Sequence, residues 1–334
     1  MTLKILGIEN QPRTGIDTAG ANGAFSLSND PAPTRNSKGG TEMQLQWLYE
    51  SVDNDLLDKF QIISSRVRWI EKNKPSILWL HDCDSDPEAQ HLSDKENRKR
   101  FAKLVFVSNW QRQLFELRFG ILPSENIVMQ NAIHPIPAAD KDDKLIRLIY
   151  HTTPHRGLNI LVSAFTTLCG LHDNIVLDVY SSFEIYGWGE KDKEFKDILD
   201  VCKEHPQINY HGAVPNDEVR EALQKAHIFA YPSTWPETSC ISALEAMSAR
   251  CLMVAPNFGA LPETCANWAW MYPFMENQSA HANMFVNVLN QAILKLREPD
   301  VQNNLDFQKM YFDRFYNWEL RGNQWTGFLQ GLNY

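Results

Sequence analysis

The amino-acid sequence predicts an α/β protein built from two doubly wound, Rossmann-like domains. Short apolar segments alternate with longer polar or amphipathic segments in two successive series, as expected for strand–helix repeats around parallel sheets. A charged segment at residues 139–144 separates the two series and is interpreted as a linker. The length of 334 residues also suits two domains of ~150 residues each.

The first series begins with the apolar segment 3–9, which predicts a strand. Residues 10–38 are rich in Gly, Ser, Asn and Pro and lack periodicity, which predicts a long loop, either a functional lid or a disordered segment. Gly39 and Gly40 then precede a predicted helix. Further strands are expected at 60–65, 76–80, 103–108 and 126–137, with a helix at 108–120 that Ser108 and Gly120 cap.

The second series repeats this alternation and ends in helices. Strands are expected at 145–153, 174–182, 208–214 and 267–273, and helices at 156–169, 190–205, 216–226 (capped by Asn216) and from 279 onward. Segment 229–263 adds a strand, a polar loop, a helix, a second strand and a loop. Doubly wound domains bind ligands at the carboxyl ends of their strands, so two of them predict a cleft.

Composition and charge argue against several classes of protein. The net charge of −9 disfavours a nucleic-acid partner. No apolar run approaches the ~18 residues of a membrane span, and the N-terminus shows no signal-peptide pattern. The six cysteines form no C-x-x-C pair, which predicts buried free thiols in a reducing compartment. We therefore expect a cytoplasmic protein, with peripheral association with a membrane left open.

Segment 229–263 carries the strongest functional signal. Glu237 precedes its predicted helix and Glu245 lies inside that helix, while Thr238 and Ser239 stand at the helix start. A helix N-terminus attracts anions because its first N–H groups lack partners, and carboxylates bind hydroxyls. The pattern suits a nucleotide-sugar. In the alternative interpretation, Glu237 only complements the helix dipole and Glu245 is a surface charge, although its apolar neighbours predict a buried carboxylate with a partner.

Three glycine-containing turns are further candidates. Arg156 and Gly157 open a predicted helix, where an arginine can pair with a diphosphate or simply lie at the surface. Gly39-Gly40 lets a ligand approach a helix start, or acts as a hinge. Residues 259–263 present N–H groups to a phosphate or sugar, or form an ordinary turn.

His81 to Asp86 form a rival signal directly after a predicted strand. Asp84 and Asp86, with Asp82, suit a divalent metal holding a diphosphate, but Pro87 and Ser93 break the calcium-loop pattern. His81 is a candidate polar contact or acid–base group, or a structural histidine. A basic cluster at 95–103 predicts a solvated helix face, with an anionic acceptor or a membrane surface as the alternative.

These segments together resemble the retaining GT-B glycosyltransferases of family 4, the glycosyl transferases group 1. The most specific match is YPSTWPETSCISALEAMSARCLMVAPNFGALPET at 231–264. Weaker matches lie at 39–42, 107–120, 131–135, 152–165 and 211–223. The resemblance implies an acceptor-side domain at 1–140, a donor domain at 141–312, and a last helix at 313–334 that returns to the N-terminal domain.

The resemblance also implies roles for individual residues. Glu237 falls against hydroxyls of the donor sugar, Glu245 against the ribose, and Arg156 beside the diphosphate. The backbone at Thr238 and Ser239 falls at the phosphates. Gly39 and Gly40 fall where the backbone approaches the phosphates. Val214 and Ala213 fall at the nucleobase. His81 falls beside the reacting carbon of the sugar. Two departures are His151 in place of a second basic residue and Arg250 in place of a glycine.

The implied reaction moves a hexose from a UDP- or GDP-sugar to an acceptor hydroxyl with retention of configuration, without a metal or other cofactor. The acceptor is a carbohydrate, a lipid-linked molecule or a small molecule. The leaving phosphate takes the acceptor proton, so Glu237 positions the sugar rather than acting as a base. Two alternatives stay open: a metal-dependent transferase that uses Asp84 and Asp86, and a non-catalytic nucleotide-sugar-binding module on the same fold.

Overall fold

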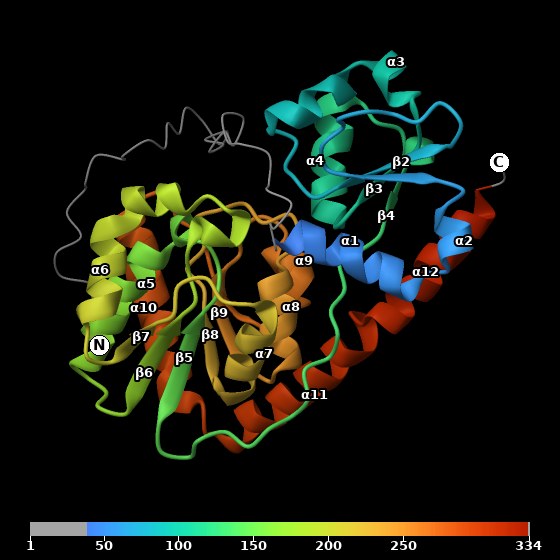
Figure 1. Ribbon diagram of the computed structural model, residues 1–334. Coiled ribbons are helices and arrows are strands. Elements are labelled where there is room, and N and C mark those ends of the chain that lie inside the picture. The colour runs from blue at the N-terminus through green and yellow to red at the C-terminus, as the bar shows by residue number, and fades with distance from the viewer. Residues whose placement is uncertain (1–38, 333–334) are drawn as a thin grey trace. The chain divides into compact units, whose positions relative to one another are not determined.

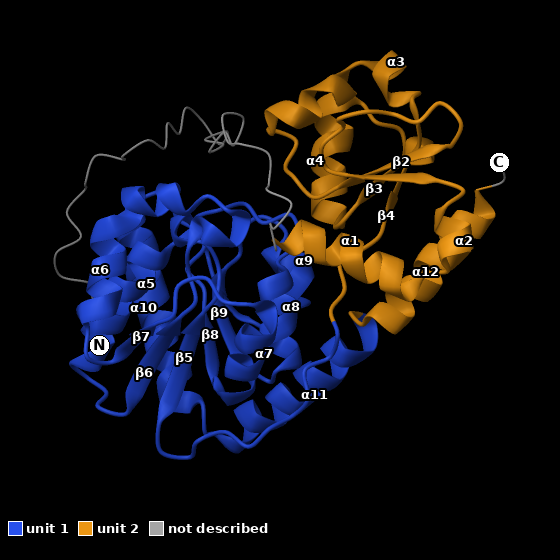
Figure 2. Ribbon diagram, in the orientation of Figure 1, with its two compact units in different colours: residues 1–11, 33–38, 134–315 blue, residues 12–32, 39–133, 316–334 orange. Residues whose placement is uncertain are grey.

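A computed structural model describes residues 39–332 and divides them into two compact units. Unit 1 contains residues 134–315, and unit 2 contains residues 39–133 and 316–332 (Figure 2). The divisions fall between Ile133 and His134 and between Phe315 and Tyr316, where the sequence led us to expect 140/141 and 312/313. The expected strand at 3–9 and loop at 10–38 lie outside the described residues.

Unit 2 contains a parallel sheet with strand order β1-β2-β3-β4. Its strands are β1 (Gln61–Ser64), β2 (Ser76–Leu80), β3 (Phe101–Phe106) and β4 (Asn126–Val128). Its helices are α1 (Gly40–Ser51), α2 (Asn54–Leu57), α3 (Lys95–Arg98), α4 (Asn109–Phe119) and α12 (Trp318–Gly331), with 3-10 turns η2 (Pro87–Ser93) and η3 (Pro123–Glu125). The predicted capping of α4 is confirmed, because Ser108 accepts a hydrogen bond from the Gln111 N–H and Gly120 has a φ of 64°.

Helix α12 packs into the core of unit 2 although it is the last element of the chain (Figure 1). Trp325 is buried with its ring centroid 5.0 Å from that of Trp79 on β2. The indole N–H of Trp318 donates to the Ala132 carbonyl at 3.1 Å. Large aromatic side chains of this kind dominate the burial of apolar surface, so α12 is an integral part of this unit.

Unit 1 contains a parallel sheet with strand order β10-β9-β8-β5-β6-β7. Its strands are β5 (Ile146–Tyr150), β6 (Ile175–Val179), β7 (Ile208–Tyr210), β8 (Ile228–Ala230), β9 (Leu252–Pro256) and β10 (Trp270–Tyr272). Strands β8 and β9 are buried along their whole length, which explains their continuous apolar sequence. The α/β fold class with two parallel sheets is therefore confirmed.

Helices cover both faces of this sheet (Figure 1). They are α5 (Leu158–Cys169), α6 (Lys196–Glu204), α7 (Asn216–Lys225), α8 (Ile241–Ser248), α9 (Leu261–Cys265), α10 (Gln278–Lys295) and α11 (Pro299–Phe315), with 3-10 turns η4 (Pro154–Arg156), η5 (Phe183–Tyr186) and η6 (Gly189–Phe195). Helix α7 begins at Asn216, and Pro215 occupies the N-cap position. The prediction that Asn216 caps this helix is therefore wrong. Within residues 39–332, no helix is long and apolar enough to cross a membrane.

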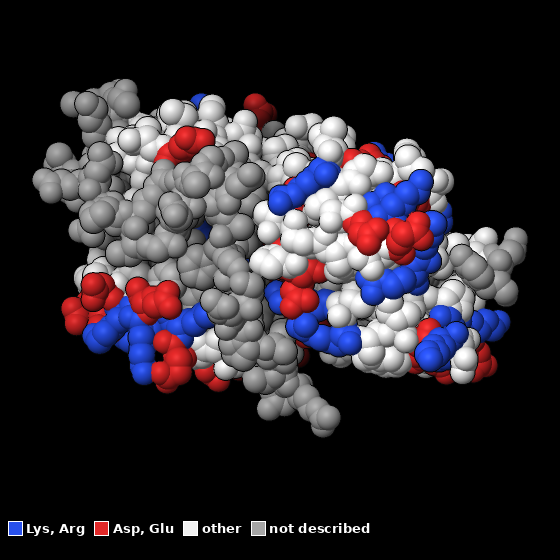
Figure 3. Space-filling model, turned by 90° about the horizontal axis from the view of Figure 1, so that it is seen from above, with Lys and Arg blue, Asp and Glu red and all other residues white. Residues whose placement is uncertain are grey.

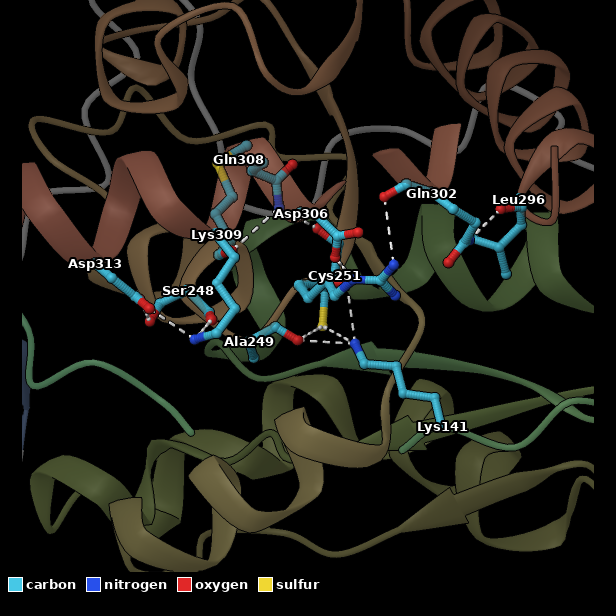
Figure 4. Close-up of polar contacts among 12 residues, drawn as sticks. Lys141, Ser248, Ala249, Cys251, Leu296, Gln302, Asp306, Gln308, Lys309 and Asp313 are labelled. Atoms are coloured by element: carbon cyan, nitrogen blue, oxygen red, sulfur yellow. Dashed lines mark hydrogen bonds and ion pairs between the residues drawn. The ribbon is translucent and has the colours of Figure 1, made fainter. Parts of the chain in front are cut away.

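Two lysine side chains fix the C-terminal end of α8 (Figure 4). Lys141 donates to the carbonyl oxygens of Ala249 at 2.8 Å and Arg250 at 3.0 Å. Lys309 on α11 donates to the Ser248 carbonyl at 2.9 Å and to Asp313 at 2.8 Å. The interpretation of 139–144 as a plain linker is therefore wrong, since Lys141 satisfies helix-end carbonyls that otherwise lack partners.

Two other local expectations change in the structure. Arg250 adopts a left-handed φ of 62°, so the turn that glycine usually makes is formed by an arginine. Its Nε donates to Asp306 at 2.5 Å, which adds a bond that glycine lacks. In the basic cluster at 95–103, Arg98 is buried and donates to Glu125 at 3.0 Å instead of facing solvent. Among the described residues on the face shown in Figure 3, Lys and Arg side chains lie next to Asp and Glu side chains and form no extended single-sign surface.

Replacing Lys141 with methionine is expected to destabilise unit 1. The change leaves the carbonyls of Ala249 and Arg250 without their donor, at a cost of ~1–3 kcal/mol for each buried group left unpaired. We expect the free energy of unfolding, measured by urea titration, to fall by about 2 kcal/mol or more. Lys144→Met is the control because Lys144 is exposed. Equal stability of the two variants would contradict the assigned role.

Candidate active site

The candidate site lies where the strand order of unit 1 reverses direction. Strand β5 pairs with β6 on one side and β8 on the other, so the chain progresses outward in both directions from β5. The segments after β5 and β8 therefore diverge at the carboxyl edge of the sheet. This switch point is the usual ligand site of doubly wound sheets. Arg156 follows β5, and Glu237 follows β8.

Arg156 and Glu237 form a buried ion pair at this position. An Nη1 proton of Arg156 is donated to Oε1 of Glu237, and the hydroxyl of Tyr231 donates to the same oxygen. The side chains of Arg156 and Glu237 are 22% and 6% exposed. The guanidinium carbon also lies 5.8 Å from the ring centroid of Trp235. The pair is thus enclosed by aromatic groups on two sides, while part of the guanidinium stays accessible.

Charge and protonation at the pair follow from burial and proximity. Burial disfavours a charged guanidinium, but the Glu237 carboxylate beside it raises the pKa of Arg156 well above its ordinary value. Burial, reinforced by the Glu237 charge, raises the pKa of the Tyr231 hydroxyl well above its ordinary value. Tyr231 is therefore a neutral donor at physiological pH, and Arg156 is a permanent cation.

Two glycines allow the loops around the pair to approach each other. Gly157 has a φ of 105°, and a Cβ there would lie 2.2 Å from the Pro232 carbonyl oxygen. Gly259 has a φ of 62°, and a Cβ there would lie 2.7 Å from the Glu237 backbone nitrogen. Side chains at either position would separate the loops. The turn at Gly259 therefore packs against the Glu237 backbone, and whether it also contacts a ligand stays a prediction.

Several buried polar atoms beside the pair lack hydrogen-bond partners within the described part of the chain. They are Nε2 of His151, the hydroxyls of Thr152 and Thr153, and Nε of Arg156. All four belong to the segment after β5. Burial lowers the pKa of His151 to about 3, so this ring is neutral and supplies no charge. Because buried polar groups are normally paired, such a cluster is typical of a site that binds an oxygen-rich ligand.

Glu245, the predicted ribose ligand, is paired within unit 1. It is 2% exposed and accepts hydrogen bonds from Arg220 at 3.2 Å and from Asn216 at 3.3 Å. Burial raises the pKa of Glu245, and the charge of Arg220 opposes that rise. Arg220 also donates to the His134 carbonyl at 2.9 Å. The expectation that Glu245 is buried with a partner is confirmed, while its role toward a ribose stays a prediction.

The remaining predicted residues of unit 1 surround the start of α8. Thr238 and Ser239 are half-buried, and α8 starts at Ile241 after Cys240 without a side-chain cap. The start of α8 therefore carries the partial positive charge of a helix N-terminus, which favours an anion there. Val214 is half-buried in the segment between β7 and α7.

Gly39, Gly40 and His81 belong to unit 2. Gly39 is buried at the start of α1 with a φ of −66°, so its backbone does not require glycine. Burial lowers the pKa of His81 to about 3, and its ring lies 4.7 Å from that of Trp79. His81 is therefore neutral and is a poor general acid, although it can still act as a polar contact.

The aspartates after β2 are engaged in protein contacts. Asp84 pairs with Arg118 at 3.3 Å, and Asp86 accepts from the Glu88 N–H at 2.7 Å as a helix cap. Within residues 39–332, no group of three or more His, Cys, Asp or Glu side chains is placed to hold a metal ion. These contacts give Asp84 and Asp86 structural roles.

Sequence reasoning missed Tyr231, Trp235 and Arg220 as members of the site. Tyr231 and Trp235 lie in segment 229–263, close after its predicted strand, and this position is a signal that the sequence offers. Arg220 lies on α7, 25 residues before Glu245, and only the packing of α7 beside α8 brings them together. Its sequence position alone gives no such signal.

Two parallel α/β units with a ligand-ready strand edge define the GT-B class of glycosyltransferase fold. A glycosyltransferase from Rickettsia africae aligns with a TM-score of 0.65 and 14% identity over 90% of this chain and 83% of its own. The Anabaena protein HepE, solved with UDP-glucose, aligns with a TM-score of 0.60 and 15% identity over 77% of this chain and 72% of its own. At these identities the likeness establishes the fold alone.

The chain belongs to the family glycosyl transferases group 1, whose model matches residues 129–298, slightly more than half of the chain. Among curated proteins it is similar to a phosphatidylinositol N-acetylglucosaminyltransferase subunit of Arabidopsis thaliana. The two are 28% identical over 165 residues, which is 48% of this chain and 35% of the relative. The chain thus spans about a third of the length of that relative.

The carboxyl group of Asp82 predicts a pH dependence of stability. Burial, followed by the charge of Asp86, raises its pKa from 3.8 to about 6, and Arg66 opposes the rise. A carboxyl whose folded pKa is raised stabilises the fold below its unfolded pKa, and this contribution is lost as pH rises through 6. We expect Asp82→Asn to be about 3 kcal/mol more stable than the wild type at pH 8, because the shift of about two pKa units is worth ~1.4 kcal/mol per unit.

The difference between Asp82→Asn and wild type should largely disappear at pH 4, where Asp82 is mostly protonated in the folded protein. Urea titration at the two pH values measures it. The exposed Asp58→Asn variant is the control and should follow the wild type at both. A constant difference between Asp82→Asn and wild type across this range would contradict the raised pKa.

Proposed function

We propose that the protein is a retaining glycosyltransferase that moves a hexose from a nucleoside-diphosphate sugar to an acceptor hydroxyl without a metal. The observation that carries the proposal is the Arg156–Glu237 pair at the switch point of unit 1. A guanidinium suits a diphosphate and a carboxylate suits sugar hydroxyls. The family membership of residues 129–298, which include both side chains, supports the same assignment.

The proposed reaction replaces one bond at the anomeric carbon. The acceptor oxygen bonds to this carbon on the face that the diphosphate leaves, the carbon–oxygen bond to the phosphate breaks, and the acceptor proton passes to the departing phosphate. Arg156 and the start of α8 would stabilise the charge on the phosphate. Glu237, held by Tyr231, would orient the sugar. Glu245 would bind the ribose after exchanging part of its contact with Arg220.

The donor we propose first is a UDP-sugar, because HepE was solved with UDP-glucose on the same fold. The name of the Arabidopsis relative combines N-acetylglucosaminyl transfer with phosphatidylinositol. We therefore propose UDP-N-acetylglucosamine and a lipid-linked acceptor as the first pair to test. A cytoplasmic protein that associates peripherally with a membrane surface would meet such an acceptor.

Glu237→Gln and Arg156→Ala are each expected to lower sugar transfer at least ~10-fold, because each removes a charged contact of ~1.5–3 kcal/mol. The measurement is UDP release from UDP-N-acetylglucosamine and UDP-glucose in the presence of phosphatidylinositol vesicles, with EDTA present. We expect the wild-type rate to be the same with and without EDTA, because the proposed reaction uses no metal ion.

The matched controls are Glu276→Gln and Arg297→Ala, whose side chains lie at the surface of the same unit. Both controls should keep the wild-type rate. Near-normal rates in both site variants would reject the proposed site. Loss of the wild-type rate in EDTA would instead favour a metal-dependent transferase.

A further inference from the structure

His281 is a buried histidine of unit 1 outside the ion pair and its immediate partners. It lies in the first turn of α10 and is 1% exposed. Burial lowers its pKa to about 4, so the imidazole is neutral at physiological pH and carries a single N–H. A buried neutral imidazole acts through its hydrogen bonds, and the partners of this ring therefore decide what it does.

The imidazole of His281 bonds to three different segments of unit 1. Its Nε2 lies 3.1 Å from the hydroxyl oxygen of Tyr272 on β10, and its Nδ1 lies 3.5 Å from the backbone nitrogen of Met275, in the turn before α10. The third partner is the backbone carbonyl of Pro232, in the segment after β8. A carbonyl oxygen only accepts hydrogen bonds, so the imidazole is the donor in this contact.

The Pro232 carbonyl lies where the two loops of the candidate site approach each other. Pro232 is buried and precedes Glu237 by five residues. The same carbonyl oxygen faces Gly157, where an added Cβ would lie 2.2 Å from it. Gly157 directly follows Arg156 in the sequence. His281 therefore holds an atom that lies between the segments carrying the two members of the ion pair.

The segment between Pro232 and Glu237 is short and internally bonded. The Ser233 N–H donates to the Tyr231 carbonyl at 2.9 Å. The Ser233 hydroxyl accepts from the Trp235 N–H at 3.1 Å and donates to the Trp235 carbonyl at 3.0 Å. These bonds restrict independent movement of the residues in this segment. A displacement of Pro232 is therefore passed on to Glu237.

We propose that His281 is a positioning residue of the transferase, which holds the Pro232 carbonyl and thereby keeps Glu237 in the geometry that orients the donor sugar. The inference rests on the proposed function and deepens it. When position 281 carries no donor, the buried carbonyl of Pro232 loses a hydrogen bond, and this loss favours a shift of the segment. A small displacement of an orienting group is enough to slow a group transfer.

The test compares His281→Phe with His281→Gln in the transfer assay and measures UDP binding by isothermal titration calorimetry. Phenylalanine replaces the ring but donates no hydrogen bond, whereas glutamine keeps an N–H. We expect kcat to fall about 10-fold in His281→Phe and to stay within about threefold of wild type in His281→Gln. Both variants should keep the wild-type affinity for UDP, because UDP lacks the sugar that Glu237 orients.

His172→Phe is the matched control. The ring of His172 bonds to Asn290 on the same helix, α10, at 2.7 Å. This variant removes a histidine bond to α10 and leaves the contact between His281 and Pro232 unchanged, so it should keep the wild-type kcat. Melting temperatures without ligand and the number of UDP sites per chain measure how much of each variant is folded.

The outcomes separate this inference from the proposed function. Wild-type kcat in His281→Phe overturns the role of His281 and leaves the transferase standing. Equal losses in His281→Phe and His281→Gln also overturn it, because donation to Pro232 is then not the property that matters. A fall in kcat that only follows a lower number of UDP sites per chain overturns it as a folding defect. A wild-type protein that transfers no sugar overturns the proposed function and the role of His281 together.

Discussion

The ion pair between Arg156 and Glu237 is the central interaction of the candidate site. It exists because β5 and β8 are neighbours in the sheet although 81 residues separate the two side chains. Burying two charges is costly and seldom adds net stability, so a buried pair is weak evidence for a purely structural role. The pair lies at the switch point, beside buried polar atoms of the segment after β5 that have no hydrogen-bond partner within residues 39–332. This position connects the pair to ligand binding.

The surrounding framework holds this edge of the sheet in one geometry. Helix α8 carries Glu245 in its interior, and Lys141 and Lys309 bind the carbonyls at its far end. Gly157 and Gly259 let the loops close around Glu237 without a side chain between them. Precise placement of this kind matters for group transfer, because orientation and fixed charges supply most of the rate when no protein nucleophile takes part.

Much of the fold could be predicted from the sequence because both parallel sheets leave a strong local pattern. Strand β2 at Ser76–Leu80 matches its expected bounds, and the caps of α4 follow from Ser108 and Gly120. Arg156 and Glu237 could be singled out because each follows a strand. The sequence does not reveal that Arg156 pairs with Glu237 or that Glu245 pairs with Arg220, because these contacts depend on strand order and helix packing. Lys141 was misinterpreted since a charged segment does not reveal which lysine binds buried carbonyls.

The most direct test of the central claim is a thermal-shift panel of UDP, GDP, ADP and TDP on the wild type and on Arg156→Ala. A nucleotide that binds the folded state stabilises it by mass action, by about 2.7 kcal/mol at a hundred times its Kd. We predict that one nucleotide, with UDP the first candidate, raises the melting temperature of the wild type by several degrees and leaves that of Arg156→Ala nearly unchanged. No shift with any of the four, or an equal shift in the variant, would contradict it.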